Sequence, residues 1–287
     1  MCSVTILSAN YNNAKFLTEY FESIFSSKVL PESIVFVDDA STDNSLEIVE
    51  KYINKGIEIK LVALEKNIGF ANALNIGLDY CNTKYILRLD PDDYISNKRI
   101  DLQYNYLTNN PDIDAIGSNA TYFKDKKTIN KSNFIPNEKV IQSRYRNGEH
   151  GLLHGTVMIK TKLLKQYKYN QENVPAEDYD IFSRMIKDGK RFYNLVEPLT
   201  YVRIHASSVS NALPYRTVKL TYQLRDKIFK TKTLALIIFL NYFHMKMYRK
   251  YLFEKRTLYK YFYLIVASII RLDKVYSRIN QFVFKNQ

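Results

Sequence analysis

The sequence predicts an α/β fold, a mostly parallel sheet with helices on both faces, followed by a basic, aromatic-rich helical region. Short β-branched apolar runs alternate with segments of helical apolar spacing through residues 3–90, as they do where crossover helices join buried parallel strands. Polar residues follow each of these apolar runs. The formal net charge of +13 lies almost entirely after residue 212. We therefore expect two parts, residues 1–212 and residues 213–287.

The first strand, helix and second strand form one β-α-β unit. SVTILSAN (residues 3–10) and SIVFVDDA (33–40) are the predicted strands. The segment between them carries apolar side chains at helical spacing: Phe16, Leu17, Tyr20, Phe21, Ile24 and Phe25.

The pattern then repeats. STDNSLEIVEKYI (41–53) opens with capping residues and predicts a helix, and IEIKLVAL (57–64) predicts a strand. FANALNIGLDYC (70–81) predicts the next helix and KYILRLD (84–90) the next strand. Four strands with crossover helices imply a mostly parallel sheet.

Ligands of such sheets bind beyond the carboxyl ends of the strands. SANYN follows the first strand, Asp38 and Asp39 end the second, EKNIGF follows the third, and LDPDDY ends the fourth. These four polar segments should meet at one edge of the sheet, so we expect the binding site there.

Asp90, Asp92 and Asp93 lie close together after the fourth strand, where their charges repel one another unless a cation or a helix start compensates. Two interpretations follow from the local sequence. Asp92 or Asp93 could cap the helix NKRIDLQYNYL, or the Asp-x-Asp could hold a divalent ion together with substrate phosphates. A calcium loop is excluded, because Ile95 stands where that loop needs glycine.

Other classes of site are not indicated. The eight glycines form neither a P-loop nor a dinucleotide-binding loop. Cys2 and Cys81 are far apart and lack companions at zinc spacing, so neither a disulfide framework nor a zinc site is expected. The N-terminal MCSVTILSANYNN has no basic stretch before its apolar run, so we expect no signal peptide and a cytoplasmic protein.

Several segments together resemble the family 2 glycosyltransferases, inverting enzymes of the GT-A fold, of the bacterial surface-polysaccharide and O-antigen type. They are SVTILSANYNN, VDDASTDNS, NIGFANALNIGL and LDPDDY, followed by LLHGTVMIKTKLL, PAEDYDIFSRMIKDG and EPLTYVRIHASSVS. The resemblance spans about residues 3–210 and rests on the order of these segments.

The resemblance implies roles for donor-side residues. Asp39 would accept a hydrogen bond from the ring NH of uracil or thymine, and Asp92 would be the ligand of Mn²⁺ or Mg²⁺. His205 would reach the metal or the diphosphate. The remaining implied donor-binding residues are Ala9, Asn10, Tyr11, Asn67, Asn72, Asp90 and Arg203.

An acceptor hydroxyl needs a base, and the resemblance implies Asp178, with Glu177 supporting it or binding the acceptor. On local grounds alone, two acids at a helix start could simply suit the helix dipole. His154 lies near the expected acceptor side, where the sequence favours a hydrogen-bonded structural histidine over a functional one. His150 and His244 receive no role from the sequence.

The basic C-terminal part contains two apolar stretches, TLALIIFLNYF and YFYLIVASII, which are too short for a bilayer core that takes about twenty residues. Flanking basic clusters and interleaved tyrosines are typical of helices that lie on an anionic membrane. Packing of these helices on protein is the alternative, and nucleic acid is not expected as a partner.

The sequence therefore predicts a metal-dependent inverting glycosyltransferase, peripheral on the inner face of the cell membrane. Its expected donor is a nucleotide-diphosphate sugar, UDP-linked first of all, and its expected acceptor a lipid-linked glycan. A processive polymer exporter is disfavoured, because no long spanning segment follows the catalytic part. The alternative is an inactive, membrane-bound partner of another transferase.

Overall fold

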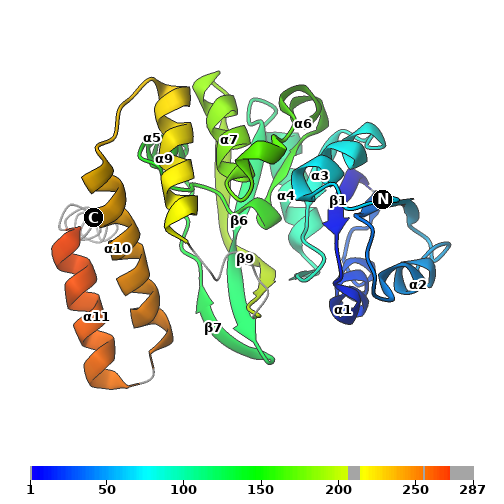
Figure 1. Cartoon of the computed structure of the whole chain (residues 1–287). Helices are drawn as coiled ribbons and strands as arrows, with labels where there is room; N and C mark the ends of the chain where they lie inside the picture. The colour runs from blue at the N-terminus through cyan, green and yellow to red at the C-terminus, as the bar shows by residue number, and fades with distance from the viewer. Residues whose placement is uncertain (1, 206–213, 255, 272–287) are drawn as a thin grey trace. The chain divides into compact units, whose positions relative to one another are not determined.

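The computed structural model describes residues 2–205, 214–254 and 256–271 (Figure 1). The chain divides into two compact units, Met1–Asn211 and Ala212–Gln287.

The first unit is built on one sheet with the strand order β3-β2-β1-β4-β8-β6-β9-β5, and β7 pairs with β6. The strands are β1 (Cys2–Asn10), β2 (Pro31–Asp38), β3 (Glu58–Ala63), β4 (Tyr85–Arg88), β5 (Tyr94–Ile95), β6 (Ala115–Lys124), β7 (Lys127–Lys131), β8 (Met158–Lys160) and β9 (Phe192–Arg203). The four strands expected from the sequence are all present as the β3-β2-β1-β4 half.

Pairing is parallel within that half and mixed beyond it. Ile6 of β1 lies opposite Ile34 of β2 and opposite Leu87 of β4, both in parallel register. Strand β8 then runs antiparallel to both β4 and β6, while β9 is parallel to β6. The expected mostly parallel sheet is confirmed for the N-terminal half, and the structure adds a mixed half after β4.

The helices of this unit are α1 (Ala14–Phe25), α2 (Ser45–Glu50), α3 (Phe70–Asp79), α4 (Arg99–Asn109), α5 (Glu138–Arg146), α6 (Thr161–Tyr167) and α7 (Glu177–Lys187), with 3-10 turns η1 (His154–Thr156) and η2 (Gln171–Asn173). Helix α2 is shorter than the sequence pattern predicts.

Helices cover both faces of the sheet, as expected, because successive strand residues point in opposite directions. On one face, Phe36 of β2 contacts the rings of Tyr20 and Phe21 from α1. On the other face, Gly77 of α3 approaches β1 so closely that a Cβ there would lie 2.5 Å from the Leu7 side chain. A larger residue at position 77 would push α3 off the sheet.

The second unit contains α9 (Tyr215–Phe229), α10 (Ala235–Phe253) and α11 (Thr257–Ile270). Asp226 near the end of α9 accepts hydrogen bonds from Thr231 and Thr233, which fixes the turn into α10. His244 of α10 bonds to the Ala267 carbonyl oxygen of α11 at 2.8 Å. Of the helices in the described residues, none has the length and apolar content that crossing a membrane requires.

Candidate active site

The end of β2 carries two buried aspartates with different contacts. Asp38 accepts hydrogen bonds from the Asn10 amide at 2.8 Å and from the Ser41 hydroxyl at 2.7 Å, so it ties the ends of β1 and β2 together. Its other oxygen accepts from the Ser41 backbone N–H at 2.8 Å. Asp38 therefore has a structural task, and it holds Asn10 beside Ala9 in the buried end of β1.

Asp39 holds the loop that follows β3. Its two carboxylate oxygens accept from the backbone N–H groups of Ile68 at 2.8 Å and Gly69 at 2.9 Å. Asn72 closes the same loop by donating to the Ile68 carbonyl oxygen at 2.9 Å. Asp39, which is predicted to bind the nucleobase, is therefore held by the same loop that carries Asn67. The Asn67 side chain is exposed.

Tyr11 follows β1 directly and is 48% exposed at the strand edge. A large, half-open aromatic ring next to the Asp39 loop is available for stacking on a nucleobase.

Asp90 lies just beyond β4 against a fully buried arginine. The Arg88 guanidinium donates to Asp90 Oδ1 at 2.7 Å, and it also donates to the Leu7 carbonyl oxygen. Burial raises the pKa of Asp90, the Arg88 charge opposes this rise, and the Asp92 charge adds to it. Gly155 makes room for the carboxylate, since a Cβ there would lie 3.0 Å from Asp90 Oδ2.

Asp92 and Asp93 diverge from one another. Asp92 Oδ2 lies 2.9 Å from His205 Nε2, whereas buried Asp93 accepts from the Arg203 backbone N–H at 2.8 Å. Burial, followed by the charges of Asp92 and Asp90, raises the pKa of Asp93 well above its usual value. Helix α4 has no side-chain cap, so the capping interpretation of Asp92 or Asp93 is wrong. Long-range contacts hold both carboxylates instead, Asp93 with Arg203 at the end of β9 and Asp92 with His205 just after it.

Arg203 braces this cluster. Its Nε donates to the Asp92 carbonyl oxygen at 2.9 Å, and its guanidinium lies 4.6 Å from the ring centroids of both Phe16 and Phe123. It also pairs with Glu19. The Arg203 side chain therefore ties the end of β9 to the loop between β4 and β5 that carries Asp92.

Asp92 and His205 are the residues that would hold a divalent cation, because a carboxylate oxygen and an imidazole nitrogen are both metal-ligand types and Asp92 Oδ2 lies 2.9 Å from His205 Nε2. Residues 2–205, 214–254 and 256–271 contain no group of three or more His, Cys, Asp or Glu side chains placed to hold a metal. A cation here would therefore depend on oxygen ligands from substrate and water, as magnesium usually does.

Glu177 and Asp178 open helix α7. Asp178 Oδ1 accepts from the Tyr179 backbone N–H at 2.7 Å and lies 3.3 Å from His150 Nε2. Burial alone would raise the pKa of Asp178, but His150 outweighs it and lowers the pKa to about 2. Glu177 is only 8% exposed, and burial together with the Asp178 charge raises its pKa to about 8. One carboxylate is therefore ionised at neutral pH while its neighbour keeps its proton.

His154 lies in the buried layer beneath these carboxylates. Its Nε2 is 3.3 Å from Arg88 Nε, which can only donate, and 2.8 Å from the Tyr169 hydroxyl. Burial and the Arg88 charge lower the pKa of His154 to about 3. A neutral His154 thus supports Arg88 and, through it, Asp90.

The contacts place these groups at one edge of the sheet. The Asp178 charge also contributes to the raised pKa of Asp90, after burial and Asp92, so both sides of the site share one electrostatic environment. This carboxylate-rich edge has the composition of a site for a phosphate-bearing substrate with a cation and a general base.

The family model described as Glycosyl transferase family 2 matches residues 5–168. The chain belongs to this family. An uncharacterized glycosyltransferase of Methanocaldococcus jannaschii is 31% identical over 205 residues, which are 70% of each chain. The UDP-Gal:alpha-D-GlcNAc-diphosphoundecaprenol beta-1,3-galactosyltransferase of Escherichia coli is 27% identical over 206 residues, 69% of this chain and 73% of that protein.

Solved structures share the fold. TarS 1–349 of S. aureus in complex with UDP-GlcNAc has a TM-score of 0.64 at 21% identity, over 86% of this chain and 81% of that one. The mannosyltransferase PcManGT of Pyrobaculum calidifontis, in complex with GDP-Man and Mn²⁺, has a TM-score of 0.63 at 16% identity, over 94% and 87% of the two chains. The expected GT-A fold and the expected family are both confirmed.

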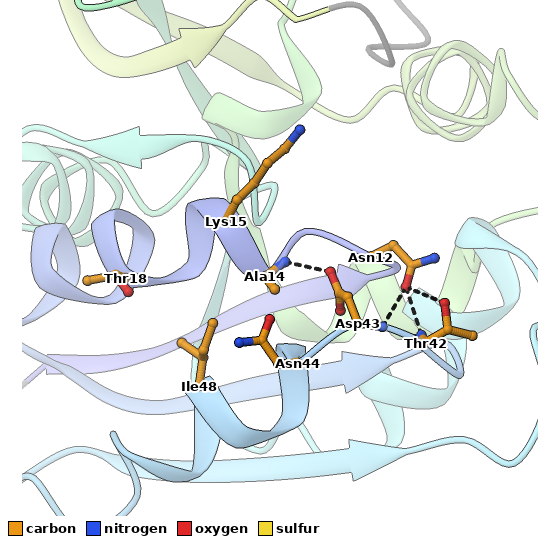
Figure 2. A pocket seen from close by; sticks show the side chains of 8 residues that line it. All are labelled: Asn12, Ala14, Lys15, Thr18, Thr42, Asp43, Asn44 and Ile48. Atoms are coloured by element: carbon orange, nitrogen blue, oxygen red, sulfur yellow. Dashed lines mark hydrogen bonds between the residues drawn. The ribbon is translucent and has the colours of Figure 1, made fainter.

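A hollow of about 700 Å³ in this family 2 glycosyltransferase is lined by none of the predicted site residues (Figure 2). Polar side chains that line the hollow form hydrogen bonds to the backbone. Asn12 Oδ1 accepts from the Thr42 backbone N–H at 2.8 Å, and Asp43 accepts from the Ala14 N–H at 2.9 Å. The other lining residues are Lys15, Thr18, Asn44 and Ile48.

Two residues contact predicted site residues without having been predicted from the sequence. His150 contacts Asp178, and Gln171 accepts from the backbone N–H groups of Ala71 at 3.0 Å and Asn72 at 3.2 Å, at the start of α3. Neither residue belongs to a segment with a local signal for its contact. The pairing of His150 with an acid 28 positions away appears only after folding.

Proposed function

We propose that this glycosyltransferase moves a single hexose-type sugar from a nucleotide-diphosphate sugar, with UDP the preferred nucleotide, to a hydroxyl of a lipid-linked glycan in surface polysaccharide biosynthesis, with inversion. The observation that carries the proposal is the shared environment of Asp90, the Asp92–His205 pair and the ionised Asp178 at one sheet edge. UDP-linked sugars appear in the names of the Escherichia coli relative and the TarS complex.

On the donor side, Tyr11 and Asp39 would bind the nucleobase. Asp90 would bind hydroxyls of the ribose or of the donor sugar. Asp92 and His205 would hold Mn²⁺ or Mg²⁺, which when bound offsets the negative charge that grows on the departing diphosphate. Arg203 holds the Asp92 loop through the Asp92 carbonyl oxygen and through its backbone contact with Asp93. The Mn²⁺ in the PcManGT complex supports this assignment.

On the acceptor side, Asp178 would take the proton of the attacking hydroxyl. The acceptor oxygen forms a bond to the anomeric carbon while the bond from that carbon to the diphosphate oxygen breaks on the opposite face. One such displacement inverts the configuration. Protonated Glu177 avoids a second negative charge beside Asp178 and can donate a hydrogen bond to the acceptor.

The C-terminal unit supports a membrane-bound acceptor. Leu258, Phe262, Ile265 and Ile269 are exposed and recur every three or four residues, so they form one face of α11, opposite buried Ala267. Most of the excess positive charge lies in the same unit. This combination fits a helix that rests on an anionic inner leaflet, peripheral to the membrane, where a diphosphate-lipid glycan would be presented.

Calorimetric binding of UDP, dTDP, GDP and CMP, each with Mn²⁺ and with chelator, tests the donor site. We expect one nucleotide, UDP first of all, to bind in a metal-dependent way, and Asp92→Ala to weaken that binding by at least about tenfold. The control Asp79→Ala removes an exposed acid at the end of α3 and should bind as the wild type does. Folded protein that binds none of the nucleotides would contradict the proposal. Metal-dependent binding without turnover on any lipid-linked acceptor would favour the inactive-partner alternative.

A further inference from the structure

We propose that His150 is a positioning residue for the base: it holds the Asp178 carboxylate by Oδ1, which leaves Oδ2 to receive the acceptor proton. The inference rests on the proposed function for the role of Asp178, whereas the pairing itself rests on the structure alone. His150 lies on the connection that follows α5, and Asp178 lies in the first turn of α7.

The hydrogen bonds of Asp178 fall on one oxygen. Oδ1 accepts from the Tyr179 backbone N–H at 2.7 Å and is 3.3 Å from His150 Nε2. Within the described part of the chain, no hydrogen bond to Oδ2 competes with these two. A carboxylate held at one oxygen by two partners has a fixed orientation, which a general base needs for a productive approach of the hydroxyl.

The backbone on both sides of His150 is itself fixed. Arg144 Nε donates to the His150 carbonyl oxygen at 2.8 Å, and Asn194 donates to the Gly151 carbonyl oxygen at 2.8 Å. Gly151 packs directly on α5, where a Cβ would lie 3.0 Å from the Ile141 backbone. A loop anchored at consecutive residues can hold its imidazole in one place.

Two aromatic rings then orient the imidazole. The ring centroid of His150 lies 5.6 Å from that of Tyr179 and 6.4 Å from that of Tyr145, and both contacts are edge-on. The Tyr179 side chain also bonds to the Tyr145 carbonyl oxygen, so α5 and α7 are joined beside His150. The His150 side chain keeps 41% of its surface exposed, so solvent can exchange protons with it.

The charges around the pair favour the ionised base. Burial opposes protonation of His150, but Asp178 outweighs it and raises the pKa of His150. The other ionisable groups that act on the pair are Arg144 and Tyr145 of α5, His154 of η1, Glu177 of α7 and Asp90 beyond β4. Together these charges keep Asp178 ionised, and His150 binds its proton more tightly than an isolated histidine does.

A proton NMR titration of the His150 ring tests the pairing without donor or acceptor. His150→Gln identifies the signal. In Asp178→Asn we expect the pKa of His150 to fall by about one unit or more, because the stabilising negative charge is gone. Asp92→Asn, which alters the other Asp–His pair, should leave His150 unchanged. An unchanged titration in Asp178→Asn overturns the pairing whatever the enzyme transfers.

The pH dependence of kcat/KM tests the role. In His150→Ala we expect kcat to fall by about ten- to hundredfold, the acidic limb to move upward by about one unit or more, and the Kd of the donor nucleotide to stay within about twofold of the wild type. His150→Gln, which keeps a side-chain donor, should restore part of kcat but not the position of the limb.

Lys139→Gln, at an exposed position of α5, is the control and should keep the wild-type profile. Superimposable profiles of His150→Ala, His150→Gln and wild type would overturn the positioning role even where NMR shows the pair. A wild type that transfers no sugar would instead count against the proposed function, and the NMR result would still decide the pairing.

Discussion

The catalytic unit buries ionisable side chains, whereas the C-terminal unit exposes large apolar ones. Arg88 is fully buried and Glu177 nearly so. In the C-terminal unit, by contrast, Leu258 of α11 is 81% exposed. Both arrangements are unfavourable for an isolated folded chain, since buried charges lose hydration and exposed apolar groups stay in water.

The difference lies in what offsets each cost. In the catalytic unit, partners within the same unit offset it: Arg88 is held by Asp90, His154 and backbone oxygens, and Asp178 by His150. Among the described residues of α11, by contrast, Leu258, Phe262, Ile265 and Ile269 stay exposed. In the proposed function the first unit carries the chemistry and the second attaches the protein to the membrane.

The largest effect is expected for Asp178→Asn. An amide cannot take the proton of the acceptor hydroxyl, so we expect turnover to fall by about 10²–10⁴-fold while the nucleotide binds as before. Sugar transfer and calorimetric binding are measured in parallel. Asp188→Asn, at the other end of α7, is the control and should keep full turnover. Normal turnover in Asp178→Asn would show that Asp178 is not the catalytic base.

A smaller effect is expected for Leu258→Ser/Ile265→Ser on α11. Each substitution removes about 1.5–3 kcal/mol of apolar burial if the side chain inserts, so binding to anionic liposomes should weaken by at least about a hundredfold for the pair. Nucleotide binding should be unaffected. The control Gln223→Ser changes an exposed polar residue of α9. Equal liposome binding by the double variant and the wild type would show that attachment does not use this face of α11.

The smallest effect is expected for Glu177→Gln, measured as Tm against pH. The folded pKa of about 8 lies above the ordinary value of 4.5, so the folded state holds a proton that the unfolded state releases. Stability from this group is complete below pH 4.5 and is lost as pH rises through about 8. Glu177→Gln should therefore melt a few degrees above wild type at pH 9 and close to it at pH 5. A constant difference at all pH values would show that Glu177 does not carry the buried proton; exposed Glu172→Gln is the control.

The elements of the N-terminal half could be predicted because their signals are local. The apolar run of β1, the helical spacing of α1 and the polar residues after each strand lie within a few residues of one another. The order of strands β8, β6 and β9 could not be predicted, since short strands such as Met158–Lys160 carry little pattern of their own. The capping interpretation of Asp93 was wrong because Asp93 accepts a hydrogen bond from the distant Arg203 backbone N–H and does not cap the nearby start of α4.

The parallel half-sheet, the family and the carboxylates at the strand ends could be predicted, because periodicity and the order of motifs can be read along the chain. The partners of those carboxylates depend on tertiary contacts. Asp92 meets His205 across 113 positions, Asp178 meets His150 across 28, and Arg88 meets His154 across 66. Such contacts depend on how the sheet, α5 and α7 pack together, and the resulting burial and charge set the pKa of each group.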